Sequence, residues 1–327
     1  MRRAAALAAL AGLLVATILL AHAGVGAVTA SFATAGLGVV GATLFHLVPM
    51  ALNGQAWRIL VGRGRGRSLP FFVGLVWVRE AVNGLLPVAR VGGEVATARL
   101  LLRRGIRAPA AVASLVVDMT VALGTQAAFT VVGLTLLAAR HPGSALARPA
   151  WLAVALALPL VALLVLVQRG GVISGLGRAA RRLLGERLAA LQLPRATGRL
   201  DRALQAVWAS RWRTLRCAGW QLLGWAAAAG ELWIFLRAAG AEVSAADALL
   251  VEALVQAVAS AAFVVPAALG VQEGAFLALG TAIGLTPALS LALALSRRAR
   301  DVLLFVPALL WWQAGEGRAT LQLRNVR

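Results

Sequence analysis

Cysteine, histidine, lysine and tyrosine are almost absent from the sequence. Cys217 is the single cysteine, which excludes a disulfide within the chain. The three histidines, His22, His46 and His141, stand too far apart in the sequence to form a helical pair of metal ligands. Lysine and tyrosine do not occur, so all 32 basic residues are arginine. We therefore expect neither a metal site nor a cofactor.

Charged residues are also scarce, at 13% of the 327 residues, whereas 61% are hydrophobic and the mean hydropathy is +0.84. These values lie far from those of soluble domains and indicate an integral membrane protein. The net charge of +20 could suit nucleic-acid binding. However, the arginines cluster between apolar segments without an accompanying aromatic face, which is typical of membrane orientation. We expect no nucleic-acid partner.

Apolar segments long enough to cross a bilayer define the expected architecture, since a ~30 Å hydrocarbon core needs ~20 helical residues. The first such segment resembles a signal peptide but leads into further membrane segments, so we expect it to stay uncleaved. Two other apolar regions, 70–104 and 247–284, are each interrupted near the middle. The sequence thus predicts an all-α integral membrane protein with about six full spans and two broken helical hairpins, re-entrant or tilted, and 8–10 membrane helices in total. The six expected spans lie at 4–22, 35–57, 109–139, 149–168, 214–236 and 287–313.

The arginine distribution orients these segments. By the positive-inside rule, the arginine-rich stretches at both termini, at 58–67 and 103–107, and in the loop 169–213 should be cytoplasmic. The arginine-poor stretches 23–34, 140–148 and 237–246 are assigned outside. Hairpin 70–104 then opens to the cytoplasm and hairpin 247–284 to the outside. Within the basic loop, residues 173–191 carry an apolar stripe opposite arginines, which predicts an interfacial helix on the anionic cytoplasmic leaflet.

The two interrupted regions contain a repeated motif. Residues 85–94 read "LLPVARVGGE" and residues 264–273 read "VVPAALGVQE", with the same seven-residue step from proline to glutamate. After each glutamate, a glycine precedes a proline that opens the next helix, at Gly105 and Pro109 and at Gly284 and Pro287. Because the two hairpins open to opposite sides, we expect an inverted repeat. Its first unit is 1–140 and its second is 149–315. Inverted repeats with discontinuous helices mark a class of secondary transporters.

The motif residues explain the breaks. A proline removes a backbone donor and ends a helix, and such a break persists in a membrane only where protein or a wet cavity surrounds it. Glycines permit a tight turn or a close approach. A glutamate near the start of the returning helix is stabilised by the helix dipole, and the alternative is that it only caps that helix. The predicted break residues are Pro87, Gly92, Gly93, Pro266 and Gly270.

Ionisable residues inside the apolar segments are functional candidates, because charges in a membrane are costly. Arg297 and Asp301 are four residues apart and can pair, which is also compatible with a purely structural role. Glu231 and Glu252 are interpreted as interfacial. The arginine surplus favours an anionic head group as ligand. The candidate substrate-binding residues are Glu80, Asn83, Arg90, Glu94, Arg99, Asp118, Glu273, Arg297, Arg300 and Asp301.

Two stretches carry a family resemblance: "REAVNGLLPVARVGGEVATARLLLRRG" (79–105) and "PAALGVQEGAFLALG" (266–280). They resemble the flippase-like transmembrane family of lysylphosphatidylglycerol synthases, and most closely its stand-alone branch associated with hopanoid biosynthesis, the HpnL type. The resemblance implies a multi-pass protein of the bacterial inner membrane that handles lipid. We expect no soluble aminoacyltransferase domain of the kind found in the full-length synthases, so the resemblance does not imply synthase activity.

Three functions remain open at this point. A lipid transporter or flippase accounts for the repeat, the broken hairpins and the buried charges together. A non-transporting membrane partner of lipid-biosynthesis enzymes would use the same fold for lateral association. A head-group-modifying enzyme would require a nucleophile, metal cluster or nucleotide-binding loop, and the sequence carries none of these patterns. We expect a lipid substrate and no catalytic residues.

Overall fold

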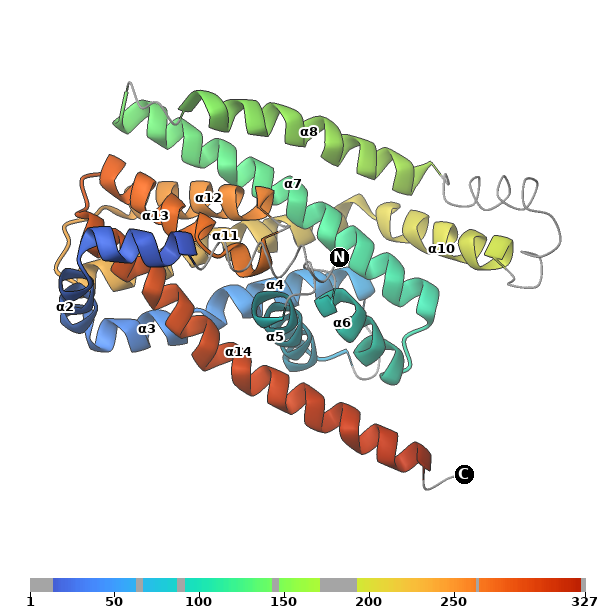
Figure 1. Cartoon of the computed structure of the whole chain (residues 1–327). Helices are drawn as coiled ribbons and strands as arrows, with labels where there is room; N and C mark the ends of the chain where they lie inside the picture. The colour runs from blue at the N-terminus through green and yellow to red at the C-terminus, as the bar shows by residue number, and fades with distance from the viewer. Residues whose placement is uncertain are drawn as a thin grey trace.

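The computed structural model describes residues 14–62, 67–86, 92–142, 147–170, 193–262 and 265–324, and these residues form helices joined by short connections (Figure 1). The all-α prediction is confirmed over these ranges. Apart from the N-terminal helix Leu14–Ala23, the elements are α2 (Val25–Ala35), α3 (Leu37–Phe45), α4 (Leu47–Val61), α5 (Leu69–Leu85), α6 (Gly92–Arg103), α7 (Ala108–Arg140), α8 (Ala147–Arg169), α10 (Leu193–Trp208), α11 (Arg211–Ala238), α12 (Ala245–Ala261), η2 (Pro266–Ala268), α13 (Val271–Ala282) and α14 (Pro287–Arg324).

The N-terminal part of the chain differs from the expected loop at 23–34. The helix Leu14–Ala23 and α2 meet at an angle of 85°, and Gly24 supplies the positive φ of 82° that this turn requires. The stretch 23–34, assigned above to an outside loop, is therefore mostly helical. The reason is that the chain stays apolar through α2, so a glycine bend redirects the helix instead of ending it.

Both interrupted regions contain two α-helices. In the first, α5 packs against α6. In the second, α12 is followed by the short helix η2 and then by α13, which packs against α12. The break in the second region is strained, since Ala267 and Ala268 have φ of 52° and 49° without being glycine.

The turns after the two hairpins have the same hydrogen bonds. Gly105 N–H donates to the Leu102 carbonyl at 2.9 Å, and Gly284 N–H donates to the Thr281 carbonyl at 3.1 Å. The next amide in each turn bonds back five residues, Ile106 to Leu101 and Leu285 to Gly280. Both glycines have positive φ, of 77° and 91°. These bonds end α6 and α13 in the same way, before a proline-containing first turn of the next helix.

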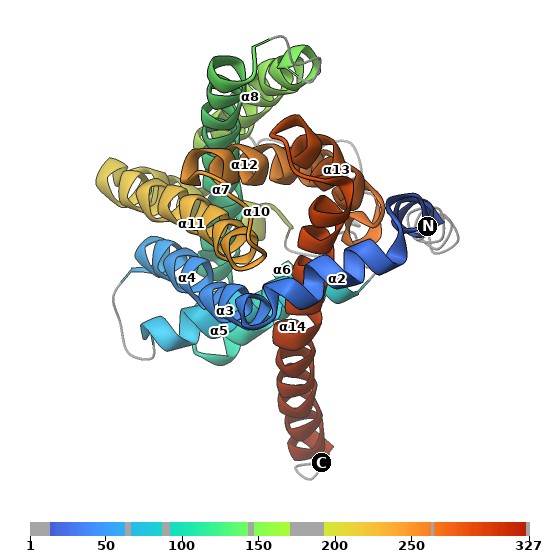
Figure 2. The ribbon, with the colours of Figure 1, turned by 90° about the vertical axis from the view of Figure 1, so that its left-hand side faces the viewer.

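Each hairpin packs against the long helix that follows the other one. Helix α5 packs against α14, and α12 packs against α7, while α4 and α11 lie side by side between them. The end-on view in Figure 2 shows α3, α4, α11 and α12 grouped around this centre. Charged side chains of α5, α12 and α14 thereby meet in one interior region, where Glu231 of α11 pairs with Arg300 of α14.

Helix length and composition distinguish the clearest membrane spans. Among the described residues, two helical segments are long and apolar enough to cross a membrane, Leu37–Val61 and Ala108–Arg140, and the bent pair Leu14–Ala23 and Val25–Ala35 makes a third if it is one span. Helices α5 and α12 have only 17 residues each and α13 has 12. Helix α14 carries three arginines and an aspartate within five residues, which lowers its hydropathy.

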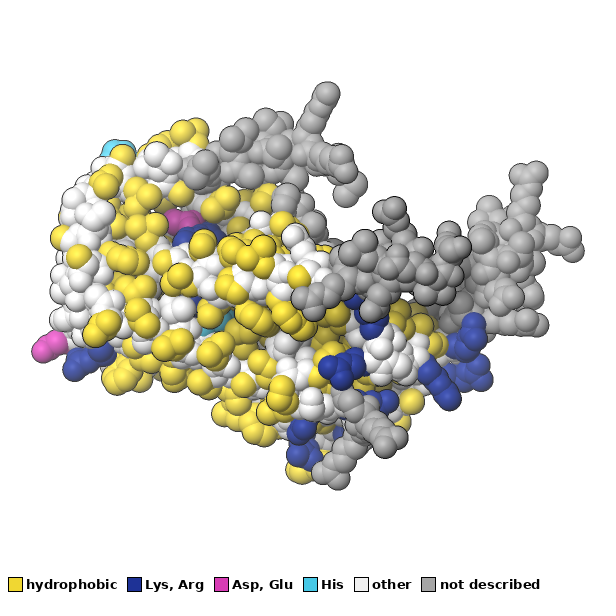
Figure 3. All heavy atoms as spheres, turned by 90° about the horizontal axis from the view of Figure 1, so that it is seen from below, with side chains coloured by type: hydrophobic (Ala, Val, Ile, Leu, Met, Phe, Trp, Pro, Cys, Tyr) yellow, Lys and Arg dark blue, Asp and Glu magenta, His cyan; other side chains and the backbone are white. Residues whose placement is uncertain are grey.

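Apolar side chains cover much of the surface in Figure 3, and basic side chains gather toward the end where α10 and the start of α7 lie in Figure 1. The exposed arginines at the end of α6 and just before α7 include Arg103, Arg104 and Arg107. The last part of α14 projects from the body in both Figure 1 and Figure 2. The interfacial helix expected at 173–191 lies outside the described residues.

Candidate functional site

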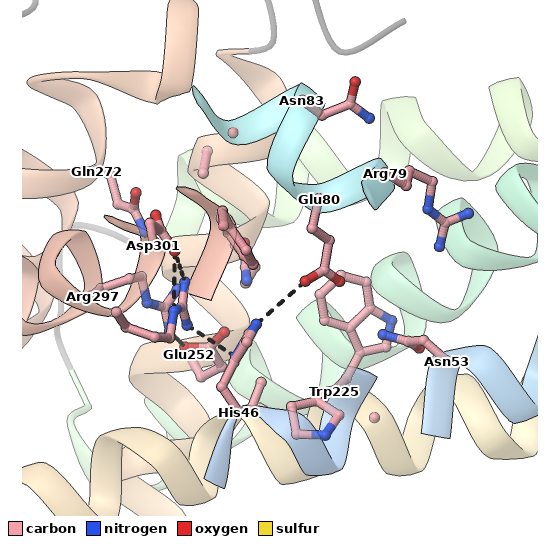
Figure 4. Close-up of a pocket in the computed structure, with 18 of the residues that line it drawn as sticks. His46, Asn53, Arg79, Glu80, Asn83, Trp225, Glu252, Gln272, Arg297 and Asp301 are labelled. Atoms are coloured by element: carbon pink, nitrogen blue, oxygen red, sulfur yellow. Dashed lines mark hydrogen bonds and ion pairs between the residues drawn. The ribbon is translucent and has the colours of Figure 1, made fainter. Parts of the chain in front are cut away.

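A cavity of about 340 Å³ lies where the two hairpins meet α4, α11 and α14. Figure 4 shows Glu80 directed toward His46, with Glu252, Arg297 and Asp301 close together on the other side of His46 and Arg79 standing apart. Such a volume is at the low end of the range of small-molecule sites, which is roughly 300–1,000 Å³. Its polar and charged lining residues are His46, Asn53, Arg79, Glu80, Asn83, Gln221, Trp225, Glu252, Gln256, Gln272, Arg297, Arg298, Arg300 and Asp301.

The arginines of α14 pair with carboxylates on other helices. Arg297 donates to Glu252 of α12, and the two side chains are 4% and 0% exposed. Arg300 donates to both carboxylate oxygens of Glu231 on α11, at 2.7 and 2.8 Å. The possible Arg297–Asp301 pair is therefore not formed: Asp301 accepts from its neighbour Arg300 at 3.0 Å. Glu252, which is buried on the packed helix α12, takes the place of the i, i+4 partner.

Arg298 ties α14 to the break in the second hairpin. Its Nε donates to Glu273 Oε1 at 2.8 Å, and its Nη1 donates to the Ala267 carbonyl at 2.9 Å. Glu273 Oε2 also accepts from the Gly270 N–H at 2.7 Å, at the start of α13. Glu273 thus caps its own helix and binds an arginine at the same time. Pro266 opens η2, and Gly270 has the positive φ of 74° that the turn into α13 needs.

The first hairpin is closed by Asn83 of α5. The Gly93 N–H donates to Asn83 Oδ1 at 2.9 Å, and Asn83 Nδ2 donates to Glu94 Oε1 at 3.4 Å. A Cβ at position 93 would lie 2.5 Å from the Arg79 carbonyl oxygen, so only glycine permits this approach. Gly92 is half-buried at the start of α6, whereas Pro87 and Arg90 lie outside the described residues.

A second buried charge group links α5, α7 and α11. Arg79 Nη1 donates to Asp118 Oδ2 at 2.7 Å, and Gln221 Nε2 donates to Asp118 Oδ1 at 3.0 Å. Asp118 is 1% exposed. The Arg79 guanidinium also lies 5.1 Å from the centre of the Trp57 ring. Asp118 therefore contacts two residues of the cavity wall without lining the cavity itself.

His46 lies at the junction of α3 and α4 and contacts acidic residues from two other helices. Its Nδ1 is 2.9 Å from Glu231 Oε2, and its Nε2 is 3.4 Å from Glu80 Oε2. Figure 4 shows His46 and Glu80 facing each other across the cavity. The histidine thus connects the first hairpin to α11.

The structure gathers most of the sequence candidates but not all. Glu80, Asn83, Arg297, Arg300 and Asp301 line the cavity, and Glu94, Asp118 and Glu273 contact residues that do. Arg99 is exposed on α6 and does not belong to the lining.

Sequence reasoning missed His46 and Gln221 and interpreted Glu231 and Glu252 wrongly as interfacial. Glu231 and Glu252 are 4% and 0% exposed. The available signal was their position as isolated polar residues within apolar runs, far from any arginine-rich turn.

The cavity has no arginine surplus. Each of Arg79, Arg297, Arg298 and Arg300 already holds a carboxylate. The expectation that free arginines attract an anionic head group is therefore not met by the described residues, because folding neutralises these arginines within the protein.

Several buried polar atoms of the cavity still lack a hydrogen-bond partner among the described residues. They are Glu252 Oε1, Arg297 Nε and Arg298 Nη2. An unpaired buried polar atom is costly, so such atoms favour a site that binds polar groups or water. The two arginine nitrogens are donors, and the glutamate oxygen is an acceptor. No group of three or more His, Cys, Asp or Glu side chains in the described ranges could hold a metal ion.

A polar cavity enclosed by apolar helices, with ion pairs joining helices distant in sequence, defines a multi-pass helical membrane protein with an internal polar site. A family model described as the lysylphosphatidylglycerol synthase TM region matches residues 4–308. The chain belongs to this family. No curated protein and no solved structure matches it.

Proposed function

We propose that this protein is a lipid transporter of the flippase kind, and that the cavity holds the polar head group of the lipid. The observation that carries the proposal is the charged cavity between the two broken hairpins, lined from α5, η2, α13 and α14. A volume of about 340 Å³ suits a head group but not acyl chains. The chains would remain against the apolar outer surface of the helices.

The inverted repeat is part of this proposal. It is supported by the matching turns at Gly105 and Gly284 and by the reciprocal packing of α5 on α14 and α12 on α7. In transporters of this architecture, a site between two repeats is exposed to each side of the membrane in turn. The six-plus-two arrangement of spans and hairpins, with units 1–140 and 149–315, belongs to the same proposal.

The paired arginines favour a head group that is polar or carries both charges over one that is only anionic. A purely anionic group would have to displace Glu252, Glu273 or Glu231 from its arginine, and separating a buried ion pair is costly. A group with both a donor and an acceptor can leave these pairs intact, because it can bond Glu80, whose side chain is 28% exposed, and the uncharged polar lining.

We further propose that the protein resides in the bacterial inner membrane with both termini in the cytoplasm. The exposed arginines before α7 and the gathering of basic side chains at one end support this orientation. These arginines would contact the anionic cytoplasmic leaflet. A link to hopanoid or phospholipid metabolism rests on the sequence resemblance alone, as does the HpnL assignment.

The second candidate function is that of a membrane partner for lipid-biosynthesis enzymes, without transport. The apolar side chains exposed on α8, such as Leu156 and Leu166, would serve as such a surface. Lipid contact explains the same exposure equally well, so transport remains the function that the cavity supports best. We propose that the protein does not alter the lipid covalently.

Reconstitution into liposomes tests transport directly. Fluorescent lipids with anionic, zwitterionic and uncharged polar heads are added, and an impermeant reductant reveals the fraction that changes leaflet. Gly84 lines the cavity and Gly74 lies on the same helix with no atom within 4 Å of its Cβ position. We expect Gly84→Leu to fill the cavity and abolish transport, and Gly74→Leu to transport like the unmodified protein.

Equal leaflet exchange in protein-free and protein-containing liposomes, for every lipid, would contradict the transport function. Mass spectrometry of the recovered lipids distinguishes transport from modification, since an enzyme would change their mass. Thermal unfolding of both glycine variants establishes that the comparison is made on folded protein.

A further inference from the structure

His46 occupies an unusual place for a titratable residue. It lies between α3 and α4, within the apolar segment Leu37–Val61 that is long enough to cross the membrane. Pro49 has no N–H to donate to the Phe45 carbonyl, so the helical hydrogen bonds are interrupted next to His46. The side chain is 12% exposed and faces the cavity.

The charged groups facing the ring come from three helices. Glu231 of α11 lies 2.9 Å from Nδ1, and Glu80 of α5 lies 3.4 Å from Nε2. Arg300 of α14 places its Nη1 3.1 Å from the same Nδ1. The ring of Phe305, also on α14, makes an edge contact with the imidazole at 6.1 Å between ring centres.

These contacts cannot all be hydrogen bonds at one time. To bond Glu231, Nδ1 must carry a proton, whereas to accept from Arg300 it must present a lone pair. The imidazolium form donates from Nδ1 to Glu231 and from Nε2 to Glu80. The neutral form with its proton on Nε2 donates to Glu80 and accepts from Arg300. The cavity therefore contains the partners of both protonation states.

We propose that His46 is a proton-binding site that couples lipid movement to the proton, an inference that rests on the proposed transport function. One proton from the aqueous phase binds the Nδ1 lone pair, and the resulting imidazolium is held between Glu231 and Glu80. On release, the proton returns to water on the other side of the membrane. Arg300 keeps its bonds to Glu231 and Asp301 in both states.

Glu80 makes this site responsive to the head group. Its side chain is 28% exposed, against 6% for Glu231, so it is the carboxylate that a bound donor reaches from the cavity. A head group that bonds Glu80 removes one partner of the imidazolium. Binding of the proton and of the head group are therefore linked, and linkage is reciprocal.

Nitrogen NMR of the imidazole rings tests the proton site directly. The chain has three histidines, so the double variant His22→Gln, His141→Gln leaves one labelled ring. We expect that ring to pass between a form with one protonated nitrogen and a form with two within pH 5–8, the range in which histidine changes charge. A ring that keeps one protonation state across this range overturns the proposal.

Transport in liposomes with an imposed pH gradient tests the coupling. Reversing a gradient of about one pH unit should change the unmodified protein's transport rate by about tenfold, because the ratio of charged to neutral imidazole changes about tenfold per pH unit. His46→Gln should transport at one rate under both gradients. His141→Gln is the matched control, because His141 faces Asp247 at 3.9 Å, away from the cavity, and it should behave as the unmodified protein.

The outcomes separate this inference from the proposed function. If the transport rate does not depend on the gradient and is equal in His46→Gln and the unmodified protein, the proton coupling is overturned. The proposed transport function is not affected by this result. No transport of any lipid by the unmodified protein overturns the proposed function and the coupling together, and the NMR titration then decides whether His46 binds a proton.

Discussion

Arg297 on α14 and Glu252 on α12 form an ion pair that is almost entirely shielded from solvent, with side-chain exposures of 4% and 0%. The guanidinium also lies 5.1 Å from the ring centre of Phe276 on α13. This pair holds the second hairpin against the last long helix. Removing one member of a buried pair leaves an uncompensated charge, whereas replacing both members with apolar residues is often neutral.

Arg297→Leu should therefore lower the free energy of unfolding by about 3–5 kcal/mol, because Glu252 is left buried without its partner. The double variant Arg297→Leu, Glu252→Leu should recover most of this loss. Thermal and denaturant unfolding in detergent measure both. Arg237→Leu, at an exposed position on α11, is the control and should change little. If the double variant lost as much stability as Arg297→Leu and Glu252→Leu together, the result would contradict the pairing.

Because Asn83 closes the first hairpin, we predict that substitutions at two positions lower the stability of the protein. Asn83→Ala leaves the Gly93 N–H without its acceptor and should lower the free energy of unfolding by about 1–3 kcal/mol. Gly93→Ala brings a Cβ to 2.5 Å from the Arg79 carbonyl oxygen and should cost a similar amount. Gly74→Ala on α5 meets no atom within 4 Å and should be neutral or stabilising. Equal stability of Gly93→Ala and Gly74→Ala would show that the close approach is absent.

The two motif glutamates should behave differently. Glu273 accepts 2.7 and 2.8 Å hydrogen bonds from Gly270 and Arg298, whereas Glu94 accepts one of 3.4 Å from Asn83. Glu273→Gln should therefore lower stability by about 1.5–3 kcal/mol, the usual value for a hydrogen bond to a charged group. Glu94→Gln should stay near the stability of the unmodified protein.

Transport rates of the same purified variants test the hypothesis that the Glu94 and Glu273 carboxylates take part in transport in addition to any capping role. Under that hypothesis both Gln variants lose transport, and Glu94→Gln loses it without loss of stability. An unmodified rate in Glu94→Gln would exclude a role for that carboxylate in transport. A parallel loss of rate and stability in Glu273→Gln would assign that residue to capping.

Local backbone chemistry made the hairpin breaks predictable. Pro266 and Gly270 lie at the break because proline removes a donor and glycine adopts positive φ, and neither property depends on distant residues. The turns at Gly105 and Gly284 follow from the same reasoning. All-helical structure followed from the long apolar segments.

The partners of the buried charges were not predictable in the same way. The sequence rule available for Arg297 was the i, i+4 pair with Asp301, yet its partner Glu252 is 45 residues away. His46 lies 185 residues from Glu231. Such contacts depend on which helices pack together, and a single sequence carries no record of helix packing. The prediction of a loop at 23–34 was likewise wrong, because a low arginine content does not distinguish a loop from the apolar helix α2.

The inverted arrangement predicts opposite accessibility for the two turns that follow the hairpins. Ile106 and Leu285 are buried, at 4% and 9% exposure, so labels there would react slowly on either side. Arg107 and Thr286 are the neighbouring exposed positions at the start of α7 and α14. In a Cys217→Ala background, Arg107→Cys should react with an impermeant maleimide from the cytoplasmic side only, and Thr286→Cys from the outside only. Labelling after denaturation gives the total reactive thiol of each variant. Reaction of both cysteines from the same side would exclude the inverted repeat and, with it, the alternating site between the hairpins.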